Sequence, residues 1–201
     1  SANNSKNREK AIRQQIIESD SVEVMISVGR NFFYTKTLPC TLWFYNKKKN
    51  ECVKNKILFI DSREYYTQVD KTLNEWNEWQ IRNLSAIVSL YRGEIDEYKK
   101  LLQLYSKTLS QLIKDSDNEE IQKIDTNTSF DYIHQSIMEI IERKKEAFKN
   151  KLSTLSKKER KDQEAILDNE LSTLSELITV SKESVWLYEK FGEGEYKDIK
   201  G

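Results

Sequence analysis

Few side chains of this chain have the types and spacing that catalysis or metal binding requires. The single histidine, His134, has no second histidine and no cysteine nearby in the sequence, so a packed or surface histidine is favoured over a ligand or a base. The two cysteines, Cys40 and Cys52, lack metal-ligand spacing and are too few for a disulfide framework. The sequence therefore predicts no metal site, and its thiols favour a reducing compartment.

The charged and glycine-containing motifs also favour structural interpretations. Asp61 and Arg63 follow an apolar run, which predicts an ion pair or a loop contact there. The lysine runs 47–49 and 157–161 have the charge to contact phosphates, but the acidic residues around both favour a solvated surface. The only Gly-x-Gly, residues 192–194, follows a helical pattern, so it predicts a helix-ending turn.

Composition favours long solvated helices over an all-β fold. The 201 residues include 33% charged residues, five glycines and one proline. The 33 basic and 33 acidic residues cancel, so no global field attracts the chain to DNA or to a membrane. No apolar run is long enough to span a membrane and no signal peptide is evident, so we expect a soluble, cytoplasmic chain without membrane contact.

The first third of the sequence predicts a helix and three strands. A helix is expected over residues 8–19, and a strand buried on both faces over residues 22–28. Two aromatic and β-branched runs, 41–45 and 56–61, flank the polar segment 46–55. This pattern predicts that the two runs form an antiparallel hairpin.

The remaining sequence has helical periodicity. Apolar residues three and four apart predict helices at about 81–91 and 95–114, a helix through 133–148, and a last long helix running from 166 toward 191. Each helix is charged on its other side, so packing of the apolar faces predicts a helical hairpin or small bundle. The tryptophan pair Trp76 and Trp79 is expected to anchor the helices on the sheet, with an exposed binding surface as the alternative.

Three separated segments carry a family resemblance. Residues 9–47 read EKAIRQQIIESDSVEVMISVGRNFFYTKTLPCTLWFYNK, and residues 56–64 continue with KILFIDSRE. Together with WQIRNLSAIVSLYRGE at 79–94 and FGEGEYKDIKG at 191–201, this series resembles the modification (methyltransferase, M) subunit of type I restriction-modification systems. The chain departs from the family pattern at Gly29, where proline is usual, and at Leu38, where isoleucine is common.

The resemblance implies an α/β plus all-α chain. Residues 1–65 would be the C-terminal part of a Rossmann-like methyltransferase sheet, and residues 66–201 a helical region. The family transfers methyl from S-adenosylmethionine to adenine in DNA, using a glycine-rich turn and an Asn/Asp-Pro-Pro-aromatic motif. Because the only proline is Pro39, the second motif is absent from this sequence. We therefore expect an internal or C-terminal fragment that is inactive alone and does not bind the cofactor alone.

The resemblance also implies one site residue and several partners. Phe33 best matches the aromatic residue that stacks on the flipped adenine in related enzymes, with Phe32 or Tyr34 as alternatives, or with all three filling the end of the sheet. The implied partners are specificity and restriction subunits, and double-stranded DNA bound through the assembled complex. The alternative function is a non-catalytic helical protein-interaction module. We further expect self-association, because Val24, Ile26 and Val28 would lie on an unpaired strand edge.

Overall fold

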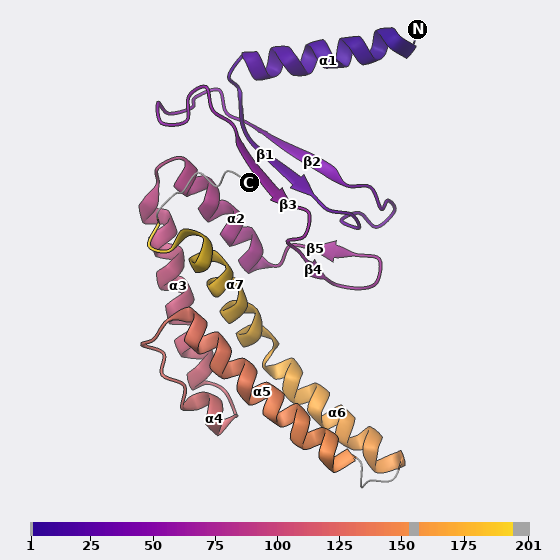
Figure 1. The fold of residues 1–201 in the computed structure, drawn as a ribbon, viewed down its shortest axis with the longest axis vertical. Coiled ribbons are helices and arrows are strands. Elements are labelled where there is room, and N and C mark those ends of the chain that lie inside the picture. The colour runs from indigo at the N-terminus through magenta and orange to yellow at the C-terminus, as the bar shows by residue number, and fades with distance from the viewer. Residues whose placement is uncertain (1, 153–156, 195–201) are drawn as a thin grey trace. The chain divides into compact units, whose positions relative to one another are not determined.

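The computed structural model describes residues 2–152 and 157–194 (Figure 1). The chain forms two compact units, Ser1–Tyr98 and Lys99–Gly201. Helix α3 (Ile95–Lys114) begins in the first unit and continues in the second. Across the described ranges the chain is a mixed α/β chain with seven helices and two small sheets.

The first unit contains a three-stranded sheet, a short two-stranded sheet and two helices. In chain order its elements are α1 (Ala2–Glu18), β1 (Val22–Val28), β2 (Cys40–Tyr45), β3 (Leu58–Ser62), β4 (Thr67–Gln68), β5 (Asn74–Glu75) and α2 (Glu78–Tyr91). The positions of α1, β1, β2, β3 and α2 agree with the sequence expectations to within a few residues at most ends. The β4–β5 pair has no counterpart among the strands that the sequence predicts.

The order of strands in the larger sheet is β2-β1-β3. Strand β1 pairs antiparallel with β2 and parallel with β3, and Met25 lies between Trp43 and Phe59. The predicted hairpin of β2 with β3 is therefore wrong. The two strands do run in opposite directions, but the apolar strand β1 lies between them because the central position buries it most completely.

Asp20 fixes the connection between β2 and β3. Its carboxylate accepts hydrogen bonds from Lys49 Nζ at 2.5 Å and from the backbone N–H of Asn55 at 3.0 Å. The backbone N–H of Asn46 donates to Ser21 O at 2.7 Å, and Val53 is buried. The polar connection is thus held against the residues that lead into β1, and it carries the chain from one side of β1 to the other.

The expected unpaired edge on β1 is also wrong. Val24, Ile26 and Val28 are buried, and each has a partner residue on both β2 and β3. The edges of this sheet are β2 and β3 instead. The argument for self-association through β1 therefore fails, because the strand is already paired on both sides.

A bulge at the start of β1 directs an acidic side chain into the unit. The β1–β2 register shifts between Val22 and Val24, which leaves Glu23 as the extra residue. The Glu23 side chain is 3% exposed and accepts two hydrogen bonds from Arg92, from Nε at 3.0 Å and from Nη2 at 2.6 Å. This pair joins the first strand to the residue that ends α2, and the hydrogen bonds from Arg92 lower the pKa of Glu23.

Helix α2 begins at a capping box and lies against the sheet. The Asn77 side chain accepts from the Gln80 backbone, and the Gln80 side chain accepts from the Asn77 N–H. One cavity is lined jointly by Val24 of β1 and Leu84 of α2. Just before the cap, Trp76 donates from Nε1 to Tyr65 O at 2.8 Å, which supports the anchoring role for this tryptophan.

The second unit is helical. After α3 it contains α4 (Glu119–Gln122), α5 (Phe130–Leu152), α6 (Lys157–Thr173) and α7 (Ser175–Phe191). The predicted last long helix is interrupted at the buried Leu174, which separates α6 from α7. Contacts of α5 with α7, and an ion pair between Lys144 of α5 and Glu170 of α6, confirm the predicted packing of helices against one another. No helix in the described ranges is both long enough and apolar enough to cross a membrane.

Candidate functional site

The carboxyl ends of the parallel strands β1 and β3 meet at one edge of the sheet. Ligands of α/β sheets bind outside this edge, because the loops that follow the strands converge there. In this chain the converging loops surround a cavity of about 400 Å³, which we call the carboxyl-edge cavity. Its lining residues are Gly29, Arg30, Asn31, Pro39, Arg63, Glu64, Tyr66 and Asn74.

Gly29 lets the ends of the two strands come together. A Cβ atom at this position would lie 2.4 Å from Arg63 O, which is closer than atoms tolerate. The departure from the family's usual proline therefore has a physical reason in this chain. With glycine at this position, the backbone of residue 63 lies directly against the turn that leaves β1.

Asp61 and Arg63 form the ion pair that their sequence positions suggested. Arg63 Nη2 lies 2.6 Å from Asp61 Oδ2, and Arg63 Nε lies 2.9 Å from Asp61 Oδ1. The hydrogen bonds from the Arg63 side chain and backbone lower the pKa of Asp61 to about 2. The carboxylate is therefore charged at neutral pH and orients the guanidinium, which rules it out as a proton donor in this range.

Asn74 holds the other wall of the cavity. It is 7% exposed, its backbone N–H donates to Asn31 O at 2.7 Å, and its Nδ2 donates to Arg30 O at 3.0 Å. Asn31 has a positive φ of 65°, a conformation that asparagine tolerates better than most residues. These two hydrogen bonds tie the loop after β1 to the start of β5.

The aromatic residues of this loop have three different environments. The ring of Phe32 packs edge-on against Trp76 at 5.2 Å and Tyr66 at 6.3 Å between centroids. Phe33 is 47% exposed and Tyr34 is 91% exposed. Phe32 is therefore a packed anchor, whereas Phe33 and Tyr34 do not fill the end of the sheet. The stacking role of Phe33 stays a prediction, and its exposed ring meets the first requirement for it.

Other candidate positions support structural roles. His134 Nδ1 lies 2.9 Å from Ser181 Oγ, and burial lowers the pKa of the imidazole. Gly192 ends α7 with a φ of 51°, which confirms the helix-ending turn. Within the described ranges no group of three or more His, Cys, Asp or Glu side chains has the arrangement of a metal site. The side chains of Lys157, Lys158 and Lys161 lie outside the described residues.

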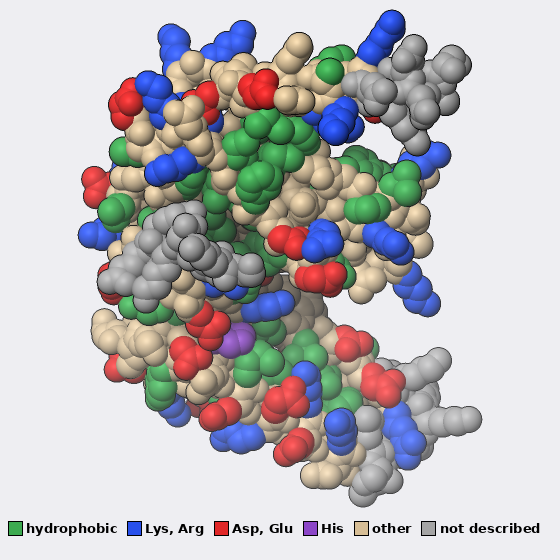
Figure 2. All heavy atoms as spheres, turned by 45° about the horizontal axis from the view of Figure 1, so that its top comes forward, with side chains coloured by type: hydrophobic (Ala, Val, Ile, Leu, Met, Phe, Trp, Pro, Cys, Tyr) green, Lys and Arg blue, Asp and Glu red, His purple; other side chains and the backbone are tan. Residues whose placement is uncertain are grey.

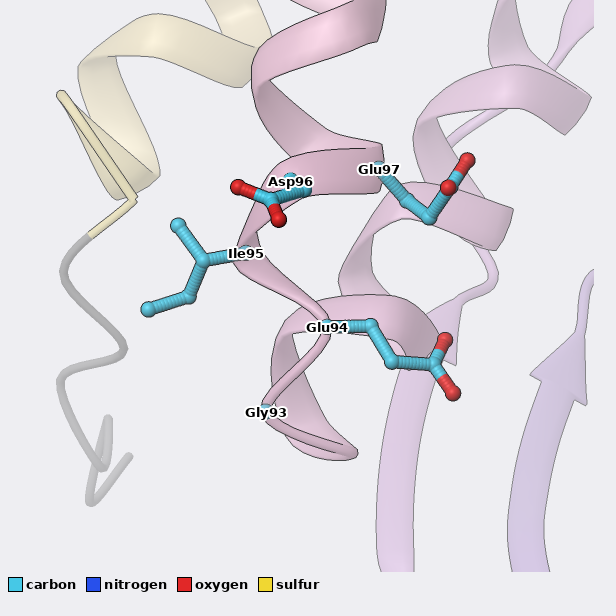
Figure 3. A pocket seen from close by; sticks show the side chains of 5 residues that line it. All are labelled: Gly93, Glu94, Ile95, Asp96 and Glu97. Atoms are coloured by element: carbon cyan, nitrogen blue, oxygen red, sulfur yellow. The ribbon is translucent and has the colours of Figure 1, made fainter.

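A second cavity follows α2 and is lined by residues 93–97 (Figure 3). The carboxylates of Glu94, Asp96 and Glu97 point in different directions in this view and do not converge. Asp96 and Glu97 belong to the first turn of α3, where negative charge stabilises the positive end of the helix dipole. We therefore assign these residues to the stability of the helix.

The residues present do not fit S-adenosylmethionine. A glycine-rich turn that follows a strand is the feature that lets a backbone approach such a cofactor. The chain's only Gly-x-Gly lies at the end of helix α7, and its only proline is Pro39.

Sequence reasoning did not single out Arg30, Tyr66 or Asn74. Arg30 is the second residue after the first strand, and this position in the sequence was the one available signal. The contacts of Asn74 span more than forty residues of chain, so no local pattern indicates them. Tyr66 likewise joins the site through ring packing that only the fold creates.

Comparison with known proteins gives consistent results. Residues 3–140 match the family described as N-6 DNA methylase. Over 93 residues the chain is 33% identical to the type I restriction enzyme MjaIX methylase subunit of Methanocaldococcus jannaschii, covering 46% of this chain and 17% of that protein. It is 29% identical over 113 residues to the MjaVII methylase subunit of the same organism, covering 49% and 20% of the two chains.

The MjaVIII methylase subunit is also similar, with 28% identity over 99 residues, 48% of this chain and 17% of that protein. The chain thus spans about a fifth or less of the length of these relatives. No solved structure matches it. The family match covers more than half of the chain, and the relatives carry the same type of name. This chain therefore belongs to the N-6 DNA methylase family.

Proposed function

We propose that the complete protein containing this chain is the modification subunit of a type I restriction-modification system. It transfers a methyl group from S-adenosylmethionine to the exocyclic amine of adenine in DNA. The observation that carries the proposal is the family match over residues 3–140, since the relatives found are methylase subunits of type I restriction enzymes.

In this proposal residues 1–65 form the C-terminal part of a Rossmann-like catalytic sheet. Residues 66–201 form the helical region that supports the sheet and contacts the specificity and restriction subunits. DNA is bound through the assembled complex in the cytoplasm. The parallel pairing of β1 with β3 supports this assignment, because parallel strands are typical of α/β sheets.

The role of this chain in the reaction is to hold the target base. An enzyme that acts on adenine in a duplex must extrude the base and hold it against an aromatic face. Phe33 has an exposed ring, and its neighbour Phe32 anchors the loop through Trp76. The ring of Phe33 would stack on the extruded adenine, beside the polar carboxyl-edge cavity.

Two observations test the proposal. The coding sequence upstream of Ser1 should encode, in frame, a glycine-rich turn after a strand and an Asn/Asp-Pro-Pro-aromatic motif. The complete protein, assembled with its specificity subunit, should transfer tritiated methyl groups to unmethylated cognate DNA. If the upstream sequence lacks both motifs and the assembled complex transfers no methyl, the proposal is wrong.

A non-catalytic helical interaction module is the second candidate. The observation that favours it is the separate apolar core of the second unit, where Ile133, Ile137 and Leu187 are buried. Under this alternative the chain binds a partner subunit although the complete protein has no methyltransferase activity. Co-purification with the specificity subunit, together with an inactive complex, would support it.

A further inference from the structure

We propose that Arg30 and Lys36 bind the DNA backbone phosphates on either side of the target adenosine. This inference rests on the proposed function and names a contact of the same site. Phosphate contacts fix the position and register of a protein on DNA, whereas contacts with the base edges recognise the sequence. An extruded nucleotide needs such contacts because its own base pair is lost.

Arg30 is the available guanidinium of the carboxyl-edge cavity. Its side chain is exposed and lines the cavity, and among the described residues it has no ion pair and no side-chain hydrogen bond. Arg63, the other guanidinium in the lining, is held by Asp61 at 2.6 Å and lies near Glu64. The charge of Arg63 is therefore balanced within the chain, while that of Arg30 is directed to a ligand.

The backbone of Arg30 is fixed before any ligand binds. Its carbonyl oxygen accepts from the buried Asn74 amide at 3.0 Å, and the preceding Gly29 packs against Arg63 O. A preorganised position lowers the entropy lost on binding. Arg30 and Phe33 are three positions apart in the chain, so their two Cα atoms lie at most about 10 Å apart.

Lys36 lies directly opposite Phe33. The two residues form an antiparallel bridge, and the Lys36 N–H donates to Phe33 O at 3.4 Å. Side chains of directly opposite residues project from the same side of the backbone pair. Lys36 is exposed and has no carboxylate partner in the described part of the chain. A base stacked on Phe33 would therefore bring one of its flanking phosphates within reach of the ammonium group.

The lysine run 47–49 is a weaker candidate for this contact. It follows β2 and precedes β3, so it lies at the amino ends of β1 and β3, opposite the edge that carries Phe33. Lys49 is also committed to Asp20 at 2.5 Å. The cations that match the position of the base are those of the loop between β1 and β2.

The test measures how DNA affinity depends on salt, using the complete protein in complex with its specificity subunit. Each lost phosphate contact reduces the slope of log K against log salt concentration by about 0.9. Arg30→Ala and Lys36→Ala should each reduce the slope by about that amount, and the double variant by about twice as much. Arg30→Lys should keep the slope, because it keeps the charge. Both side chains are exposed, so melting temperatures should not change.

The matched controls are Arg13→Ala and Lys48→Ala, two exposed cations outside the loop, which should leave the slope unchanged. Unchanged slopes for both Arg30→Ala and Lys36→Ala, or an equal loss in the Lys48→Ala control, would overturn the inference. A complex that binds DNA with the predicted slopes but never methylates it would instead overturn the proposed function alone.

Discussion

At the carboxyl edge of the sheet, one backbone contact sets the positions of the charged side chains. Gly29 lies against the carbonyl of Arg63, and Arg63 in turn binds Asp61. The buried Asn74 holds the next two residues of the loop. Its side-chain amide donates to Arg30 O, and its backbone N–H donates to Asn31 O. The loop after β1 is therefore held through its backbone groups, while the exposed side chain of Arg30 remains available for a ligand.

Replacing Gly29 by alanine should strain this edge. The new Cβ would overlap Arg63 O, so either β1 or β3 must shift, and overpacking of this kind costs about 1–3 kcal/mol. Urea unfolding of the chain should show this loss in the free energy of unfolding. The control Thr37→Ala, at an exposed position of the same loop, should change it by less than about 0.5 kcal/mol. Equal stabilities for the two variants would show that Arg63 O leaves room for a Cβ atom at position 29.

The Asp61–Arg63 pair should be insensitive to pH in the neutral range. The pKa of Asp61 is about 2 in the folded chain, below its ordinary 3.8, so the pair's contribution is complete above about pH 4. That contribution is lost as the pH falls from 4 toward 2. Carbon-detected NMR titration of the Asp61 carboxyl should give this low value, and Arg63→Ala should raise the pKa toward the ordinary 3.8 without reaching it, because the backbone N–H of residue 63 still donates to Asp61. A wild-type value near 4 would mean that the pair does not form in solution.

Sequence reasoning could reach part of this site. The aromatic run beside the end of a strand was visible, as was the pairing of Asp61 with Arg63. The sequence could not show that Phe32 is packed while Phe33 is exposed. The residues that pack against Phe32, Tyr66 and Trp76, are distant in the sequence and come close only when the chain folds. Asn74 was missed for the same reason.

At the scale of elements, the main feature is the insertion of β1 between β2 and β3. The sequence predicts the three strands but wrongly pairs β2 with β3, since an apolar run indicates a strand without identifying its neighbours. The order depends on the polar segment after β2, which Asp20 binds near the start of β1. Similarly, the apolar stripe of the last helices runs through the buried Leu174, so periodicity alone did not reveal the break there.

Hydrogen exchange distinguishes this order from a β2–β3 hairpin. A central strand pairs its amides with neighbours on both sides, whereas an edge strand leaves alternate amides unpaired. We expect protection along Val24–Val28, the part of β1 that pairs with both neighbours, and fast exchange of alternate amides in β2 (Cys40–Tyr45). Fast exchange at alternate positions of β1 would place β1 at an edge and restore the hairpin.

The Glu23–Arg92 pair should stabilise the first unit more than the exposed ion pairs of that unit do. Removing one partner of a buried pair costs about 3–5 kcal/mol, and because Arg92 is 36% exposed we expect about 3 kcal/mol for Arg92→Ala. The matched control is Arg82→Ala, which breaks the exposed i,i+4 pair with Glu78 and should cost about 0.5 kcal/mol. Both values follow from chemical denaturation, and equal losses would argue that water enters the Glu23 site.

At the scale of the whole molecule, charge is balanced overall but unevenly distributed along the chain. Residues 1–60 contain 11 lysines and arginines against 5 aspartates and glutamates, although the full chain has no net charge. Basic and acidic side chains are interspersed on the face shown in Figure 2. Under the proposed function, single cations at the carboxyl edge, more than a net charge, would contact DNA.

We propose that this chain presents Phe33 to the target adenine of a type I modification enzyme. The direct measurement is methyl transfer to cognate DNA by the assembled complex, with wild-type protein and with Phe33→Ala. Because base–aromatic stacking contributes about 1–3 kcal/mol, turnover or target binding should fall roughly tenfold to a hundredfold. Phe33→Trp should keep most of the activity, and Tyr34→Ala should resemble the wild type.

The half-exposed position of Phe33 predicts that Phe33→Ala melts near the wild-type temperature, so the loss of activity would not reflect unfolding. A Phe33→Ala complex that melts normally and methylates at the wild-type rate would show that Phe33 does not stack on the target adenine. A loss confined to Tyr34→Ala would instead move the stacking role by one residue.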